Sequence, residues 1–168
     1  MLKKRLMAVV TVKDGQAVQS FGYRRYLPLG RPEILVENLD RWGADEILVQ
    51  CIDCSTTGAG PDFALLERIG RLGLATPLIY AGGIRRVEDG RAAVQAAADR
   101  ICVDALLHDD LDVVRGLGER LGAQALIAAL PLARLSDGLR WLDHRTRTAK
   151  LLAPGLLDLL ASRVISEA

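Results

Sequence analysis

The cysteines are the side chains of this chain best suited to redox or metal chemistry. Cys51 and Cys54 form a Cys-x-x-Cys pair, and Cys102 or His108 could lie at the same end of the fold. A thiolate pair with one further ligand can hold zinc, and a Cys-x-x-Cys pair alone can be redox active. Redox motifs of this spacing normally open a helix, whereas this pair closes a predicted strand. We therefore favour a packing role or an unreactive thiol, and we expect no metal site and no cofactor.

A second group of functional side chains is a basic cluster near Trp141, which could contact a phosphate or a nucleic acid. Its alternation with apolar residues more simply indicates a hairpin with one solvated face. The net charge is +1, so no overall field attracts nucleic acid, and we expect no nucleic-acid partner. The cluster consists of Arg140, His144, Arg145, Arg147 and Lys150.

The composition is typical of a cytoplasmic globular protein with one domain, residues 1–168. Half of the residues are hydrophobic, which permits a sizeable core. Charged residues near the start, such as Lys4 and Lys13, interrupt any signal-peptide core, and no apolar stretch approaches a membrane span of about 20 residues. We expect no membrane partner. An odd number of cysteines without an export signal favours reduced thiols.

The elements that must position these side chains alternate between strand and helix, with a repeat of about 30 residues. Such alternation predicts parallel strands joined by right-handed crossovers. Asp-Gly turns at 14–15 and 137–138 predict two hairpins, at 12–20 and 137–144. We predict strands at 5–12, 46–52, 77–81, 100–103 and 125–130, and helices at 32–42, 61–73, 87–97, 111–121 and 154–167.

The predicted fold class is α/β, a truncated (β/α)8 TIM-type barrel with about five parallel strand-helix units plus hairpin insertions. A closed barrel of this type usually takes about 250 residues, more than this chain supplies. The alternative is an open five-stranded sheet of the flavodoxin kind, with helices on both faces. In the barrel fragment the first and fifth strands would be bare apolar edges, which predicts a homo-oligomer or a heteromer.

Six short motifs, in order and at the expected spacing, carry a family resemblance. Together they resemble the cyclase subunit of imidazole glycerol phosphate synthase, a barrel that receives ammonia from a glutaminase. Two further stretches, 21–26 and 52–66, are closer to paralogues that amidate a sugar in surface-polysaccharide biosynthesis. The six motifs are Met1-Leu-Lys-Lys-Arg-Leu, Val12-Lys-Asp-Gly, Gly43-Ala-Asp-Glu-Ile, Ala81-Gly-Gly-Ile, Ala98-Asp-Arg-Ile and Gly122-Ala-Gln-Ala.

The resemblance implies acid and base carboxylates that this chain lacks. Family members use an aspartate on the first strand and another on the fifth, with a third acidic position at the end of the second. These positions fall on Thr11, Pro131 and Cys51. The polysaccharide-type paralogues also lack the first aspartate. A proton-transfer pair needs ionisable groups, so the lyase activity of the cyclase is not expected of this chain alone.

The resemblance also implies a phosphate site after the third and fourth strands. Gly82 and Gly83 would let backbone N–H groups approach an anion, and Asp104 and Ala105 stand at the second position. A carboxylate beside a phosphate repels it, so Asp104 weakens this site. The family's opposite phosphate site comes from its last two strands, which we expect to lie outside this chain.

At the other end of the strands, the resemblance implies a charged gate for ammonia. Arg5, Glu46 and Arg100 correspond to gate residues, and Asp99 to a position that contacts the glutaminase. The second acidic member of the gate is expected in the missing part, so the ring should be incomplete.

Three functions remain open at the level of the sequence. The first is a degenerate HisF-like protein, related to imidazole glycerol phosphate synthase, that lacks independent cyclase activity and binds a glutaminase partner. The second is an ammonia-dependent subunit that amidates a sugar in surface-polysaccharide biosynthesis. The third is an α/β packing remnant without activity.

Overall fold

The computed structural model describes residues 4–22 and 24–168. The first residues of the opening motif and Tyr23, in the 21–26 stretch, lie outside the described residues. Ten strands form two sheets. The strands are β1 (Met7–Lys13), β2 (Gln16–Phe21), β3 (Arg25–Gly30), β4 (Glu46–Cys51), β5 (Leu78–Ala81), β6 (Arg100–Val103), β7 (Leu126–Ala128), β8 (Leu132–Leu135), β9 (Gly138–Asp143) and β10 (Thr148–Lys150).

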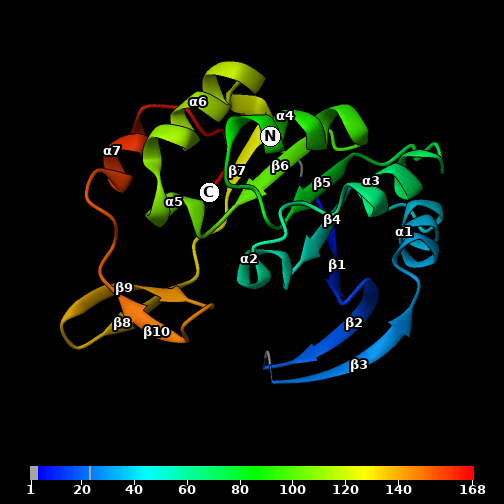
Figure 1. Ribbon diagram of the computed structural model, residues 1–168, viewed down its shortest axis with the longest axis horizontal. Coiled ribbons are helices and arrows are strands. Elements are labelled where there is room, and N and C mark those ends of the chain that lie inside the picture. The colour runs from blue at the N-terminus through cyan, green and yellow to red at the C-terminus, as the bar shows by residue number, and fades with distance from the viewer. Residues whose placement is uncertain (1–3, 23) are drawn as a thin grey trace.

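Helices connect the strands of the larger sheet, as the predicted alternation requires (Figure 1). Local capping signals mark the ends of two of these helices. Asp62 and Asp110 accept backbone N–H bonds at the starts of α3 and α6, and Gly122 follows the end of α6. The helices are α1 (Pro32–Arg41), α2 (Cys54–Thr57), α3 (Phe63–Gly70), α4 (Val87–Ala96), α5 (Leu106–Asp109), α6 (Leu111–Leu121) and α7 (Leu156–Ala161), with a 3₁₀ turn at Ala123–Ala125.

The strand order decides between the two predicted architectures. The large sheet runs β3-β2-β1-β4-β5-β6-β7, and β1, β4, β5, β6 and β7 are parallel neighbours in chain order. A flavodoxin-type sheet reverses direction at a switch point, so its strands are not in chain order. The sequential order is that of a barrel wall. The prediction of a TIM-type barrel fragment is confirmed, and the flavodoxin alternative is wrong.

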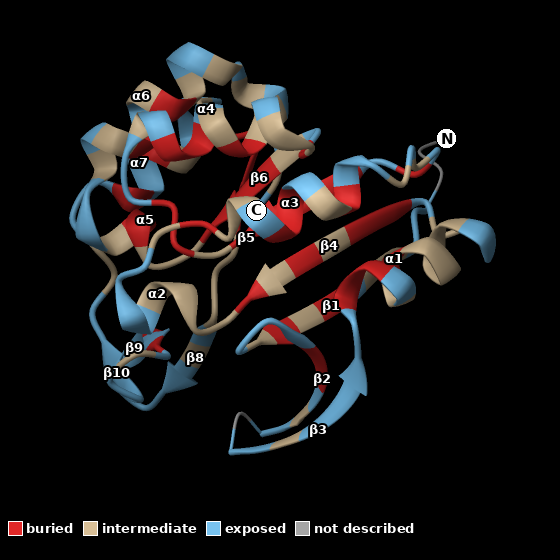
Figure 2. Cartoon of the chain, turned by 45° about the vertical axis from the view of Figure 1, so that its right-hand side comes forward, coloured by how far each residue is buried: buried red, intermediate tan, exposed pale blue. Residues whose placement is uncertain are grey.

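The two faces of the parallel strands pack differently because successive side chains point to opposite sides. On one face, Val49, Tyr80 and Ile101 join a large core with the helices. On the other, which we call the inner face, Ile79 and Cys102 belong to a small separate cluster of strand residues. Figure 2 shows buried residues concentrated on the parallel strands and exposed residues along β3 and β10.

The hairpins extend beyond their predicted limits. The first was expected at 12–20, but β3 adds a further antiparallel strand to β2, with a register shift between Ala17 and Val18. The second was expected at 137–144, and β8 and β10 flank β9 in a separate three-stranded sheet. Turn signals located both hairpins, whereas the outer strands lack a clear apolar alternation.

The predicted helix at 154–167 is wrong at its C-terminal end. α7 ends at Ala161, and Arg163 adopts a left-handed φ of 60° that no α-helix contains. Beyond it, Ile165 is buried and Glu167 forms a parallel bridge with Ile127 of β7. The backbone N–H of Ala128 donates to the Glu167 carbonyl at 2.8 Å. This segment therefore runs beside β7 as a further parallel strand would.

The first parallel strand has an open edge. Antiparallel pairing with β2 involves only Val12 and Lys13, so β1 from Met7 to Thr11 has β4 as its only strand partner among the described residues. Val9 on this stretch is half exposed. The expected homo-oligomer or heteromer stays a prediction. Within residues 4–22 and 24–168, none of the helices is long and apolar enough to span a bilayer.

Candidate functional site

The N-terminal ends of the parallel strands carry a closed ring of four charged side chains, which we call the charged ring: Arg5, Glu46, Arg100 and Glu167. Glu46 Oε1 accepts hydrogen bonds from Arg5 Nη1 at 2.9 Å and from Arg100 Nη1 at 3.2 Å. Glu167 accepts from Arg5 Nη2 at 2.5 Å and from Arg100 Nη1 at 3.1 Å. Each cation therefore touches both anions, and each anion touches both cations.

The ring is anchored on its Arg100 side and open on its Arg5 side. The Arg100 side chain is 14% exposed, and it also donates to the Gln124 carbonyl and to Ser166 Oγ. The Glu46 side chain is 7% exposed. Hydrogen bonds from Arg5, with those from Arg100, lower the pKa of Glu167, and the same Arg5–Glu167 contact raises the pKa of Arg5. These contacts therefore favour the charged forms of Arg5 and Glu167.

Glu167 corrects the expectation of an incomplete ring. That expectation depends on Glu167 lying in the last helix and on the second acidic member lying outside the chain. The structure instead brings Glu167 within hydrogen-bonding distance of Arg5, 162 residues away. The signal that could have located it is the apolar pair Val164 and Ile165, which follows the helix and buries Ile165 beside β7.

Further along the strands from the ring, the inner face gains two neutral polar side chains, Thr11 and Gln50. Strand register aligns Val9, Leu48 and Ile79 with Arg100 in a lower row. The next row, which we call the upper row, lies two residues further along each strand, and none of its members is a carboxylate. The upper row consists of Thr11, Gln50, Ala81, Cys102 and Ile127.

The three positions expected to carry catalytic carboxylates do not converge. Thr11 lies in the upper row beside Gln50. Cys51 belongs to the opposite face, where it is 2% exposed within the helix-covered core. Pro131 follows β7, and its carbonyl accepts the Leu142 backbone N–H at 2.8 Å. Only Thr11 therefore faces the interior that a barrel substrate would occupy.

Gly82 and Gly83 form a tight turn after β5. Both have positive φ, and a Cβ on Gly83 would lie 2.3 Å from the Gly60 carbonyl oxygen. Glycine is thus required by packing as well as by backbone conformation. The Gly83 N–H donates weakly to Ser55 Oγ at 3.4 Å. Close packing alone accounts for both glycines, and their role in binding a phosphate stays a prediction.

Asp104, the other predicted phosphate position, is held by the second hairpin. Its carboxylate accepts from Trp141 Nε1 at 3.2 Å and pairs with His144 Nδ1 at 3.1 Å. Trp141 stacks on His108 with ring centroids 3.8 Å apart. Neighbouring Ala105 precedes α5 in helical conformation. In this arrangement Asp104 fixes the hairpin to the end of β6, and its place in a phosphate site stays a prediction.

The basic cluster on this hairpin is largely neutralised. Arg145 and Lys150 both bond Asp143, which is 1% exposed, and Arg145 also pairs with Asp109. Burial opposes ionisation of Asp143, but these hydrogen bonds outweigh it and hold its pKa well below the ordinary value. The cluster thus serves to fold the hairpin, which agrees with the preferred sequence interpretation.

Asp99 lies at the same end of the sheet as the charged ring. Its Oδ2 accepts the Leu78 backbone N–H at 2.8 Å, and its own N–H donates to the Leu78 carbonyl. The residue also borders a groove of about 450 Å³ between the C-terminal ends of α3 and α4. Asp99 therefore fixes the start of β5 and still reaches the surface at a position suited to partner contact.

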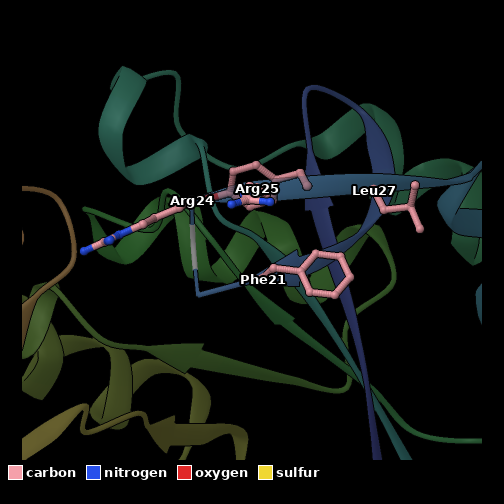
Figure 3. A pocket seen from close by; sticks show the side chains of 5 residues that line it. Phe21, Arg24, Arg25 and Leu27 are labelled. Carbon is pink, nitrogen blue, oxygen red and sulfur yellow. The ribbon is translucent and has the colours of Figure 1, made fainter.

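A second hollow, of about 500 Å³, lies at the tip of the β2–β3 hairpin. Phe21, Arg25 and Leu27 line it, and Figure 3 shows Arg24 extending away from Phe21 and Leu27. Apolar groups, two arginines and the phenol of Tyr26 gather here, and none of these lining residues is a carboxylate, a thiol or a histidine. Across the described part of the chain, no group of three or more His, Cys, Asp or Glu side chains could hold a metal ion.

Comparison with known proteins gives a consistent assignment. Residues 5–149 match the family described as "Histidine biosynthesis protein". Imidazole glycerol phosphate synthase subunit HisF of Xanthomonas campestris pv. campestris strain 8004 is 31% identical over 86% of this chain and 55% of its own length. The same subunit of Xylella fastidiosa strain 9a5c is 31% identical over 82% of this chain and 53% of its own length. The chain thus spans about half the length of these curated relatives. The match, the sequential strand order and the resemblance of the motifs agree, and the chain belongs to the histidine biosynthesis protein family as a HisF-like member.

Proposed function

We propose that this chain binds a glutaminase through the strand end that carries the charged ring, and that it has no cyclase activity of its own. The single observation that supports this best is the closed ring of Arg5, Glu46, Arg100 and Glu167. Surface ion pairs usually involve two long exposed side chains. Here Glu46 and Arg100 are largely buried at an end of the sheet, where charges are costly unless they are mutually paired.

The layers behind the ring suit the passage of a small neutral molecule. The lower row places Val9, Leu48 and Ile79 level with Arg100 and two residues along the strands from Glu46. Ions and strongly hydrated groups are disfavoured in an apolar layer, whereas neutral ammonia loses far less solvation there. We propose that ammonia from the glutaminase enters between the ring members and crosses this layer. A temporary separation of Arg5, the most exposed member, would open the way.

The absence of cyclase activity follows from the upper row. Thr11 and Gln50 can donate and accept hydrogen bonds, but neither titrates near neutral pH. Cys51 faces the opposite side of the sheet, and Pro131 has no ionisable group. General acid-base catalysis needs groups that exchange protons with the reacting atoms. The side chains present here can bind a polar ligand but cannot supply that step.

The experiment has a binding arm and an activity arm. In the first, a purified glutaminase subunit of an imidazole glycerol phosphate synthase is titrated with this chain by isothermal calorimetry. We expect measurable binding at micromolar concentration. Binding should be weaker for Glu46→Ala, which breaks the ring at the proposed contact surface, and unchanged for the control Arg115→Ala. Absence of binding by the unsubstituted chain overturns the partner proposal.

The activity arm uses ammonium and the family's histidine-pathway substrate, so that no partner is needed. We expect no product above the rate without protein. Detectable turnover would refute our reading of Thr11, Cys51 and Pro131.

A second candidate function is amidation of a sugar with ammonia from the same partner. It is favoured by the 52–66 stretch and by the hydroxyl of Thr11, which stands on the inner face beside Gln50. To test this function, the chain is incubated with ammonium and candidate surface-polysaccharide sugars, and the products are analysed by mass spectrometry. Replacement of oxygen by nitrogen in a sugar would establish the function. No change in the mass of any sugar would refute it and leave the binding role. Failure of both binding and turnover would favour the third reading, a packing remnant without activity.

A further inference from the structure

The end of β4 holds two thiols across a short turn. Cys51 is the last residue of β4 and is buried, whereas Cys54 is the first residue of α2 and is partly exposed. Ile52 and Asp53 form the turn between them. The prediction of an unreactive pair depends on the motif closing a strand. The structure places its second cysteine at the opening of a helix, so that argument against redox chemistry no longer applies.

The two thiols influence each other's ionisation across this turn. The neighbouring Cys51 thiol lowers the pKa of Cys54, whereas the Cys54 thiol, together with burial, raises the pKa of Cys51. In β5, the Tyr80 hydroxyl accepts the Asp62 backbone N–H at 2.7 Å. Because Tyr80 is fully buried, it holds this corner in place. The more exposed sulfur is therefore also the one with more thiolate character, as an attacking thiol requires.

The helix that begins at Cys54 also contacts the Gly82–Gly83 turn. Ser55 Oγ accepts the Gly83 N–H at 3.4 Å, and the Ser55 carbonyl accepts from Arg85 Nη2 at 3.0 Å. Cys51 forms the other wall, since a Cβ on Gly82 would lie 2.6 Å from the Cys51 carbonyl oxygen. A change in the Cys51–Cys54 geometry would therefore alter the packing and hydrogen bonding of the Gly82–Gly83 turn.

We infer that Cys51 and Cys54 form a reversible intramolecular disulfide, and that its formation shifts α2 relative to the Gly82–Gly83 turn. This inference is independent of glutaminase binding. It rests on the Ile52–Asp53 turn that separates the two cysteines, on the partial exposure of Cys54 and on the contact of Ser55 with Gly83. The exposed stretch 56–59 that follows Ser55 leaves room for α2 to move.

The oxidant is a small-molecule disulfide such as oxidised glutathione. The Cys54 thiolate attacks one sulfur of the oxidant, which forms a mixed disulfide and releases one thiolate that takes up a proton. The Cys51 thiol then loses its proton to solvent, attacks the Cys54 sulfur and expels the second glutathione thiolate. Two protein thiols are oxidised by two electrons, and one glutathione disulfide is reduced to two thiols.

Cys102 provides an internal control. It lies in the inner-face cluster with Ile79 and Ala81, apart from the helix-covered core that contains Cys51. Burial, together with the nearby charge of Asp104, raises the pKa of the Cys102 thiol to about 12. This thiol should react slowly with both oxidants and alkylating agents.

The test begins with the unsubstituted chain in glutathione buffers of graded oxidation state. After acid quenching, the protein is unfolded in urea at mildly alkaline pH with iodoacetamide, so that every free thiol, Cys102 included, is alkylated, and the alkyl groups are counted by mass spectrometry. We expect the oxidised protein to carry one alkyl group, on Cys102, and to lose two hydrogens through a Cys51–Cys54 bond that dithiothreitol reverses. Cys102→Ala should behave identically except for the missing alkyl group. Three alkylatable thiols at every glutathione ratio, or a stable glutathione adduct on Cys54, would overturn the inference.

A second measurement examines the turn without any substitution. Amide hydrogen exchange at Gly83 is compared between the oxidised and reduced forms of the same preparation. Because Ser55 Oγ accepts the Gly83 N–H, we expect the exchange rate of the Gly83 amide to change at least about threefold. The exchange rate of the Leu78 amide, which donates to Asp99, should stay the same within experimental error. Equal exchange at Gly83 in both forms would refute the link between the disulfide and the turn.

Discussion

Replacement of Arg100 by methionine is the most direct test of the charged ring. Methionine keeps much of the aliphatic stem but removes four hydrogen bonds, to Glu46, Glu167, Ser166 and the Gln124 carbonyl. Glu46, whose side chain is 7% exposed, then retains only Arg5 as a counter-charge. A buried carboxylate that loses one partner remains desolvated without full compensation.

The expected cost follows from the exposure of each member. Breaking a buried ion pair typically costs about 3–5 kcal/mol. Glu167 is partly exposed, and solvent can replace part of what it loses, so the lower end of the range applies, about 3 kcal/mol. For a chain of this size, a loss of 1 kcal/mol lowers the melting temperature by about 2–4 °C, so Arg100→Met should lower it by about 6–12 °C.

Urea unfolding, followed by circular dichroism, measures this difference in the free energy of unfolding, and the dependence of that free energy on urea concentration should be the same for both chains. Arg115→Met is the matched control, because Arg115 pairs with Asp112 on the exposed face of α6 and its loss should cost at most about 0.5 kcal/mol. The double variant Glu46→Gln with Arg100→Met should be less destabilised than the sum of the single variants, by about 1 kcal/mol or more. If Arg100→Met unfolds at the same urea concentration as Arg115→Met, the description of the ring as a buried, mutually dependent network is refuted.

Two further predictions concern the hairpin and the helix layer. The pKa of Asp143 is lower in the folded chain than in the unfolded chain, so its contribution to stability is fully present above the unfolded pKa of about 3.9 and is lost as pH falls toward the folded value. In Asp143→Asn, the urea midpoint should therefore decline less steeply between pH 5 and pH 2 than in the unsubstituted chain. An unchanged decline would contradict this reasoning. Gly90→Ala should destabilise the chain by about 1–3 kcal/mol despite the better helix propensity of alanine, because the new Cβ would lie 2.4 Å from Leu117 Cδ2. Thermal unfolding of Gly90→Ala checks the second prediction, and a raised melting temperature would mean that Leu117 moves aside at little cost.

The sequence by itself determined the elements whose residues are buried by their own periodic pattern. The apolar run at 46–52 predicted β4, and the helical spacing at 111–121 predicted α6 with its original limits. The alternation of such elements was sufficient for a parallel sheet with helical crossovers. Each of these features depends on side chains within one segment, and burial imposes a period of two or of 3.6 residues that can be read from the chain.

The tertiary structure alone decided which residues meet. Glu167 joins Arg5 and Arg100 across 162 and 67 positions of sequence, and Trp141 reaches Asp104 across 37. No local period encodes such contacts, because they arise only when parallel strands bring their N-terminal or C-terminal ends together. For the same reason the sequence could align Cys51 with a catalytic position but could not show that its side chain points into the helix-covered core. Strand pleating determines the face to which a side chain points, and strand register determines its neighbours.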